Sequence, residues 1–281
     1  MMESFSYFGG AHLRKRRQKM SSQRNNTGIY DRHLEYSSRG VGFLTRKDGK
    51  QTHEILKLAN EALCAVPHRG GMSSEGVGDG AGISIDLSLS FFSKLTGKHL
   101  KQNEFAVGNF FLPSDRKKHG EAITIVNDTL SRHGLALMLT RDVPIAPANI
   151  SARSKKRQLA IKQFIFENSE GLSAEKFDRL VYQVMQDIEA IAYTDPTLDG
   201  FYPLSISAKL QVLKGRLNSW EIIPYFSDLC DPDHAVHTLY FHTRFSTNTD
   251  PHPAMAQPFR LMAHNGELNT DKKNRLSEAT I

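Results

Sequence analysis

From residue 40 onward, apolar residues follow two spacings, one typical of helices and the other of strands. Apolar residues at helical spacing predict helices over 55–66, 114–133 and 174–193. Short apolar runs bounded by turn residues predict strands at 40–45, 105–112, 135–140, 159–166, 204–207, 210–213, 235–245 and 259–263. Strands toward both ends of the chain, with helices between them, indicate an α+β fold with layered sheets.

The helix predicted over 174–193 has the clearest start and the clearest apolar face. Ser173 precedes it as an N-cap, and Glu175 lies in its first turn, where a negative charge is favoured. Its apolar stripe is expected to face the core and consists of Phe177, Leu180, Val181, Val184, Ile188 and Ile191. The helix over 114–133 is expected to stop at Gly134, since glycine tolerates the left-handed backbone that commonly follows a helix.

Composition places the chain among globular proteins. It has 281 residues, of which 39% are hydrophobic and 23% are charged. No apolar run is long enough to span a membrane, and no secretory signal begins the sequence, so we expect neither a membrane nor an export route. Two cysteines are too few for a disulfide framework. A cytoplasmic location is the expectation.

The net charge of +6 is concentrated near the start of the sequence. Residues 1–24 carry a net charge of +5, which leaves +1 for the remaining 257 residues. We therefore expect residues 1–36 to form a basic, disordered leader and residues 37–281 to form the folded domain. A nonspecific tether to polyanions is the alternative for the leader, whereas the domain offers no specific nucleic-acid surface.

The glycine-rich stretch 69–82 predicts a loop and contains the motif GDGAG at 78–82. This motif lacks the third glycine of a dinucleotide-binding site and the lysine of a phosphate loop. A sharp turn, or close approach of the backbone to another segment, explains the glycines better. The histidines lie in unrelated contexts, and no metal site is expected.

The densest polar chemistry lies in 242–249 (HTRFSTNT), 256–260 (AQPFR) and 263–270 (AHNGELNT). Arg244 follows a predicted strand, and a guanidinium can bind a carboxylate through two parallel hydrogen bonds. The Asn265 amide and the Gly266 N–H can together stabilise an oxyanion. Asn-Gly is equally a favoured hairpin turn, so chemistry alone leaves both interpretations open.

These three segments resemble the glutaminase domain of the glutamate synthase large subunit, an N-terminal-nucleophile amidotransferase of class II. Further blocks resemble the same domain in the same order: 29–31, 34–35, 40–43, 68–71, 78–83, 108–113, 141–144, 225–226, 228–229 and 231–232. The resemblance implies a four-layer αββα sandwich and hydrolysis of glutamine to glutamate and ammonia. It implies that Arg244 binds the substrate carboxylate and that Asn265 and Gly266 form the oxyanion hole.

Two departures from the family pattern change what the resemblance implies. The family has its nucleophilic cysteine immediately before the Gly-Val-Gly-Phe block, where this sequence has Arg39, and a guanidinium cannot attack an amide. Ser37 or Ser38 is the alternative nucleophile, although a shift of one residue in a strand turns a side chain to the opposite face. The sequence also ends at Ile281, before the family's later acidic residue and closing strands, so the sandwich is expected to be incomplete at its C-terminal edge.

Three functional hypotheses remain open. The first is a degenerate amidotransferase-like chain that binds glutamine or glutamate, or a glutamate synthase-type partner, without catalysis. The second is an active amidotransferase component with an unusual nucleophile, and the third is a nonfunctional truncated copy. In each of them FMN and the iron–sulfur cluster belong to a separate synthase portion, and this chain carries no cofactor.

Overall fold

The computed structural model describes residues 40–67, 70, 76–156, 158–245, 256 and 258–260. The chain divides into two units, Met1–Ser38 and Arg39–Ile281, and all described residues belong to the second unit. The leader expected over 1–36 lies outside the described residues, and the boundary at residue 37 stays a prediction.

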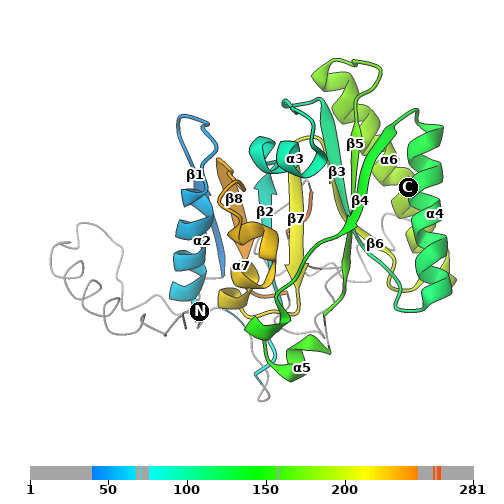
Figure 1. Cartoon of the computed structure of the whole chain (residues 1–281). Helices are drawn as coiled ribbons and strands as arrows, with labels where there is room; N and C mark the ends of the chain where they lie inside the picture. Colours follow the sequence, from blue (N-terminus) through cyan, green and yellow to red (C-terminus); the bar gives the residue numbers. More distant parts are fainter. Residues whose placement is uncertain are drawn as a thin grey trace, which may run out of the picture. The chain divides into compact units, whose positions relative to one another are not determined.

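The first sheet brings together strands from both ends of the described chain. Its order is β1, β8, β2, β7, and every neighbouring pair is antiparallel. The strands are β1 (Val41–Thr45), β2 (Ala81–Asp86), β7 (Leu210–Gly215) and β8 (Thr238–His242). Helices α2 (Glu54–Ala65) and α7 (Ile222–Tyr225) lie against this sheet (Figure 1). Their apolar side chains share one core cluster with Ile83, Leu239 and Phe241 of the sheet.

The second sheet has the order β4, β5, β3, β6 and is also antiparallel throughout. Its strands are β3 (Phe105–Phe111), β4 (Ala136–Asp142), β5 (Ile161–Glu167) and β6 (Tyr202–Ser207). Helices α4 (Arg116–Arg132) and α6 (Ala174–Thr194) cover one face of it (Figure 1). A tight turn between β6 and β7 connects the two sheets.

Shorter helical elements fill the junctions. Helix α3 (Leu89–Thr96) packs Phe91 and Phe92 against Phe105 of β3. Helix α5 (Ala152–Lys155) precedes β5. Single 3₁₀ turns cover Pro147–Asn149 (η3), Pro196–Leu198 (η4), Ser219–Glu221 (η5) and Ser227–Cys230 (η6).

The predicted α+β class is confirmed. The predicted start of α6 after Ser173 and the predicted end of α4 before Gly134 are confirmed as well, whereas α4 begins at Arg116 and not at 114. The Ser173 hydroxyl accepts from the N–H of Lys176 at the start of α6. Gly134 follows α4 with a φ of +68°, in the left-handed region that the sequence predicted.

Four expectations need correction. The strand predicted over 235–245 is shorter and spans Thr238–His242, because Val236 forms only an isolated bridge with Thr52 and residues 243–245 are not in a strand. The loop predicted over 69–82 ends earlier, since β2 begins at Ala81. Phe259 and Arg260 are not in a strand; the rest of the strand predicted over 259–263 lies outside the described residues. Helix α3 has no counterpart in the prediction because only two turns of apolar residues mark it.

One face of β1 and β8 is apolar and uncovered among the described residues. Phe43 is 65% exposed, and its ring stacks on that of Tyr240 at 5.8 Å between centroids. Val41 lies beside them and is also exposed. An apolar face on an edge strand invites association with other chains.

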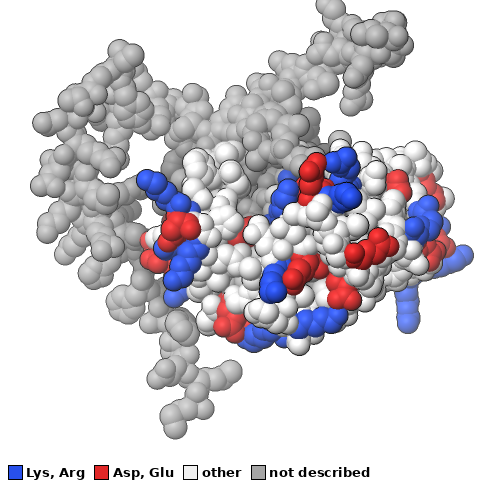
Figure 2. Space-filling view, turned by 90° about the horizontal axis from the view of Figure 1, so that it is seen from above, with Lys and Arg blue, Asp and Glu red and all other residues white. Residues whose placement is uncertain are grey.

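None of the helices in the described ranges has the length and hydropathy needed to cross a membrane. On the face shown in Figure 2, basic and acidic side chains are interspersed. That face therefore has no broad positive surface of the kind that binds nucleic acid.

Candidate functional site

The GDGAG motif runs into the start of β2, and each of its three glycines lies close to another segment. A Cβ on Gly78 would lie 2.3 Å from the Leu217 backbone, and one on Gly80 would lie 2.1 Å from the Phe245 ring. A Cβ on Gly82 would lie 2.6 Å from Cδ of Pro258. Contacts this short exclude any side chain, so close approach of other segments, as the sequence analysis inferred, explains the glycines.

Arg244 lies just beyond β8 and beside the start of β1. The N–H of Thr243 donates to the carbonyl of Gly40 over 2.7 Å, which extends the pairing of β1 with β8 by one residue. Arg244 itself donates from Nε to Oδ2 of Asp79, 3.2 Å away. Its side chain is 37% exposed and that of Asp79 is 25% exposed, so the pair lies at the protein surface and is partly shielded.

The structure thus brings together parts of four sequence blocks that the resemblance singled out. Gly40, Asp79, Arg244 and Pro258 come from blocks scattered across more than 200 residues. The antiparallel order β1-β8-β2 causes this, because the start of β1, the end of β8 and the start of β2 lie side by side at the same end of the sheet.

Among the predicted site residues, Arg244 is described. Arg39, Asn265 and Gly266 lie outside the described residues, so their predicted roles stay predictions. Gly40, the residue after Arg39, is one residue from Arg244 in the strand pairing, through its bond to Thr243.

Sequence reasoning missed Asp79 as a partner of Arg244. Asp79 stands between two glycines, and the motif was read for its glycines alone. A charged residue within a glycine-rich turn was the available signal, because such a turn exposes its side chains and backbone to neighbouring segments.

The site is suited to binding an anion. The Arg244–Asp79 bond uses Nε, and the two terminal amino groups of a guanidinium form the edge that matches a carboxylate. Thr243 is 1% exposed, and its Oγ1 makes no hydrogen bond among the residues that the structure describes. The terminal amino groups of Arg244 are the groups that a carboxylate would meet at this end of the sheet.

Within the described ranges, no three His, Cys, Asp or Glu side chains are grouped as metal ligands.

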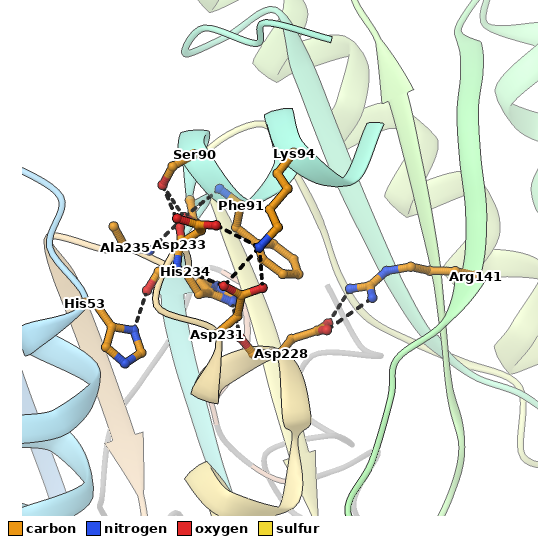
Figure 3. Close-up of polar contacts among 11 residues, drawn as sticks. His53, Ser90, Phe91, Lys94, Arg141, Asp228, Asp231, Asp233, His234 and Ala235 are labelled. Carbon is orange, nitrogen blue, oxygen red and sulfur yellow. Dashed lines mark hydrogen bonds and ion pairs between the residues drawn. The ribbon is translucent and has the colours of Figure 1, made fainter. Parts of the chain in front are cut away.

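A second polar cluster joins α3, β4 and η6 (Figure 3). Arg141 binds both carboxylate oxygens of Asp228, and its guanidinium lies over the Phe91 ring at 5.6 Å. The ring of His234 stacks on the same Phe91 ring, with 4.4 Å between the ring centroids. Lys94 pairs with Asp231 at 3.1 Å and with Asp233 at 2.7 Å.

The charged side chains of α3 and β4 pair with carboxylates in η6 and in the turn after it. We therefore interpret this cluster as a structural junction that joins these elements. Burial lowers the pKa of His234 to about 4, because the ring is removed from water and its Nε2 makes no hydrogen bond among the described residues. The hydrogen bond from Nδ1 to the Asp228 carbonyl acts in the opposite direction and only partly offsets this effect. The ring is therefore neutral near pH 7.

A cavity of about 580 Å³ opens at the other end of β2, away from Arg244. Its charged lining residues are Asp86 and Lys209. The carboxylate of Asp86 accepts from the Gln51 amide, the His237 ring and the N–H groups of His237 and Thr238. These bonds fix the turn before β8, so Asp86 serves the fold.

Comparisons with known proteins show the family of this chain. The sequence pattern that defines the family "Glutamine amidotransferases class-II" matches residues 39–279. The glutamate synthase [NADPH] large chain of Azospirillum brasilense is 35% identical over 250 residues, which cover 87% of this chain and 16% of that protein. The corresponding large chain of Bacillus subtilis is 32% identical over 251 residues, covering 88% and 16%.

Glutamate synthase [NADH] of Saccharomyces cerevisiae is 30% identical over 262 residues, which cover 88% of this chain and 12% of the yeast protein. The chain thus spans between 12% and 16% of the length of these three relatives. With the family pattern matched over most of its length, this chain belongs to the class II glutamine amidotransferases and is homologous to the N-terminal part of glutamate synthase large chains.

Proposed function

We propose that this chain is a glutamate synthase-like amidotransferase domain that binds an amino-acid carboxylate at Arg244 without hydrolysing glutamine. The observation that carries the proposal is that Arg244, its partner Asp79 and Gly40 lie at the same end of the first sheet. The resemblance implies that Arg244 binds the substrate carboxylate, and the relatives that match here are named as glutamate synthases.

The loss of hydrolysis is inferred from Arg39. The resemblance assigns the nucleophile to the residue before Gly40, and arginine supplies no attacking atom because it stays protonated. Removing the nucleophile from a serine hydrolase lowers turnover on the order of a million-fold, which sets the scale of the expected defect.

The positive charge of Arg39 also affects which ligand is favoured. If Arg39 faces the place of the substrate side chain, a dicarboxylate such as glutamate gains a charge-assisted bond there, whereas the neutral amide of glutamine does not. We therefore infer that the binding preference of this chain is glutamate over glutamine.

The finer architecture and the setting of the chain are part of the same proposal. The layers are inferred to follow the order αββα, with α2 and α7 outside one sheet and α4 and α6 outside the other. A glutamate synthase-type partner would carry FMN and the iron–sulfur cluster. A cytoplasmic setting fits this partner.

Calorimetric titration of the purified chain with L-glutamate and L-glutamine tests the proposal. We expect saturable glutamate binding that is tighter than glutamine binding and is lost in Arg244→Ala. Arg179→Ala is the matched control, since Arg179 also pairs with a carboxylate but lies exposed on α6. Absence of binding to either ligand, or binding that Arg244→Ala leaves intact, contradicts the proposal and favours a nonfunctional copy.

A further inference from the structure

Lys214 on β7 is a buried cation without a carboxylate partner among the described residues. Its side chain is 1% exposed, and Nζ donates to the carbonyl of Ala256 over 2.6 Å, with that of Pro258 at 3.5 Å. Two rings flank the ammonium, Phe259 at 4.9 Å and Tyr202 at 5.5 Å from Nζ to the ring centre. Burying a lysine is costly, and burial lowers its pKa to about 7. The contacts that offset this cost all fall on the segment 256–259 and on one ring of β6.

Arg260 fixes the other end of the same segment. It is 8% exposed, donates from Nε to the carbonyl of Ile206 over 2.8 Å, and donates from Nη2 to Asp178 over 3.0 Å. Its guanidinium also lies over the Tyr182 ring at 5.3 Å. Ile206 belongs to β6 and Asp178 to α6, so this end of the segment is attached to the second sheet and its helix.

The segment also lies directly on the first sheet beside the candidate site. Gly82 and Lys214 are paired across β2 and β7, and a Cβ on Gly82 would lie 2.6 Å from Pro258 and 2.7 Å from Cβ of Lys214. Two residues before Ala81, Asp79 holds Arg244. The path of 256–260 is therefore set by β2 and β7, next to the elements that hold Arg244.

We propose that Lys214 and Arg260 are positioning residues that clamp the described residues of the segment 256–260 between the two sheets and thereby support the start of β2, next to Asp79 and its partner Arg244. The role toward Arg244 rests on the proposed function. The clamp itself rests on the described contacts alone. A carboxylate site must be held to within a fraction of an ångström, and two fixed points on a segment packed against β2 supply that restraint.

Hydrogen–deuterium exchange and ligand titration of the full chain test the two parts separately. Lys214→Met removes the ammonium and keeps the length of the side chain. We expect at least tenfold faster exchange in peptides covering 256–260, unchanged exchange in peptides from α4, and at least tenfold weaker L-glutamate binding. Lys214→Gln, whose amide can still donate to the Ala256 carbonyl, is expected to rescue part of both effects. Lys162→Met is the matched control, because Lys162 is a largely shielded lysine on β5 that pairs with Asp142.

Each outcome has a distinct meaning. Unchanged exchange over 256–260 in Lys214→Met overturns the clamp. Faster exchange with unchanged glutamate binding overturns the positioning role. If the wild-type chain binds no glutamate, the proposed function and the positioning role both fail, while exchange still decides whether the clamp exists. Should Lys214→Met not fold, Arg260→Gln tests the other end of the clamp with the same measurements.

Discussion

The N–H of Thr243 donates to the carbonyl of Gly40 over 2.7 Å, which joins two residues that are 203 positions apart in the chain. Each is the neighbour of a residue with a proposed role, Arg244 in one case and Arg39 in the other. The bond continues the β1–β8 ladder past its last strand pair, Val41 with His242. The pairing of these strands thus places Gly40 opposite Thr243, the residue before Arg244.

The first prediction is that the purified chain releases no ammonia from glutamine. Arg39 offers no nucleophile at the place where the family has one, so turnover should be at the level of a blank without protein. The measurement is coupled detection of ammonia over a range of glutamine concentrations.

Turnover in the wild-type chain that disappears in Ser37→Ala or Ser38→Ala would identify a serine nucleophile and an active enzyme. Turnover that survives both substitutions would contradict every nucleophile considered for this chain.

The second prediction concerns Gly80, which has a φ of +136° and lies against the Phe245 ring. Gly80→Ala should lower the free energy of unfolding by about 2–4 kcal/mol, since it adds a steric clash to an unfavourable backbone conformation. Gly97→Ala is the matched control: Gly97 has a φ of +67° with open space around it, so only the backbone cost of about 1–2 kcal/mol is expected. Urea titrations of both variants measure the difference. Equal losses would show that the packing of Phe245 on Gly80 contributes little.

The third prediction is a loss of stability on acidification through His234. Its folded pKa of about 4 lies below the ordinary value of 6.5, so between these values the unfolded chain binds more protons. The contribution of His234 is fully present above about pH 6.5 and is lost as the pH falls toward 4, by up to about 3 kcal/mol. We expect the denaturant midpoint of the wild type to fall more steeply than that of His234→Phe as the pH is lowered across this window, with both proteins measured at matched pH values. Parallel curves would contradict the assignment.

The fourth prediction is that the exposed rings of β1 and β8 promote self-association. Phe43→Ser should lower the sedimentation-average mass at high concentration while leaving the unfolding midpoint nearly unchanged, because Phe43 is 65% exposed. Tyr193→Ser removes a comparably exposed ring from α6 and should leave association as it is. If both variants associate like the wild type, the exposed face of β1 and β8 is not the contact surface.

The sequence by itself determined several local elements of this protein, although it did not predict the strand β2 or the helix α3. The caps at Ser173 and Gly134, and the apolar stripe of α6, follow from hydrogen bonding and periodicity within a few residues, so they can be read along the chain. The strand ends were less certain, because pairing partners decide where a strand stops. The glycines at 78–82 indicated close approach, although the sequence could not say what approaches.

Only the tertiary structure decided which side chains meet. Asp79 and Arg244 are 165 residues apart, and the clamp of Lys214 on Ala256 joins a strand to a segment that local pattern had predicted as the approach to another strand. Such contacts depend on strand order and register, which arise from burial summed over both sheets and not from any local signal. A buried lysine is likewise unpredictable from its neighbours in sequence, because its cost is offset only by carbonyl oxygens and rings that the fold brings to it.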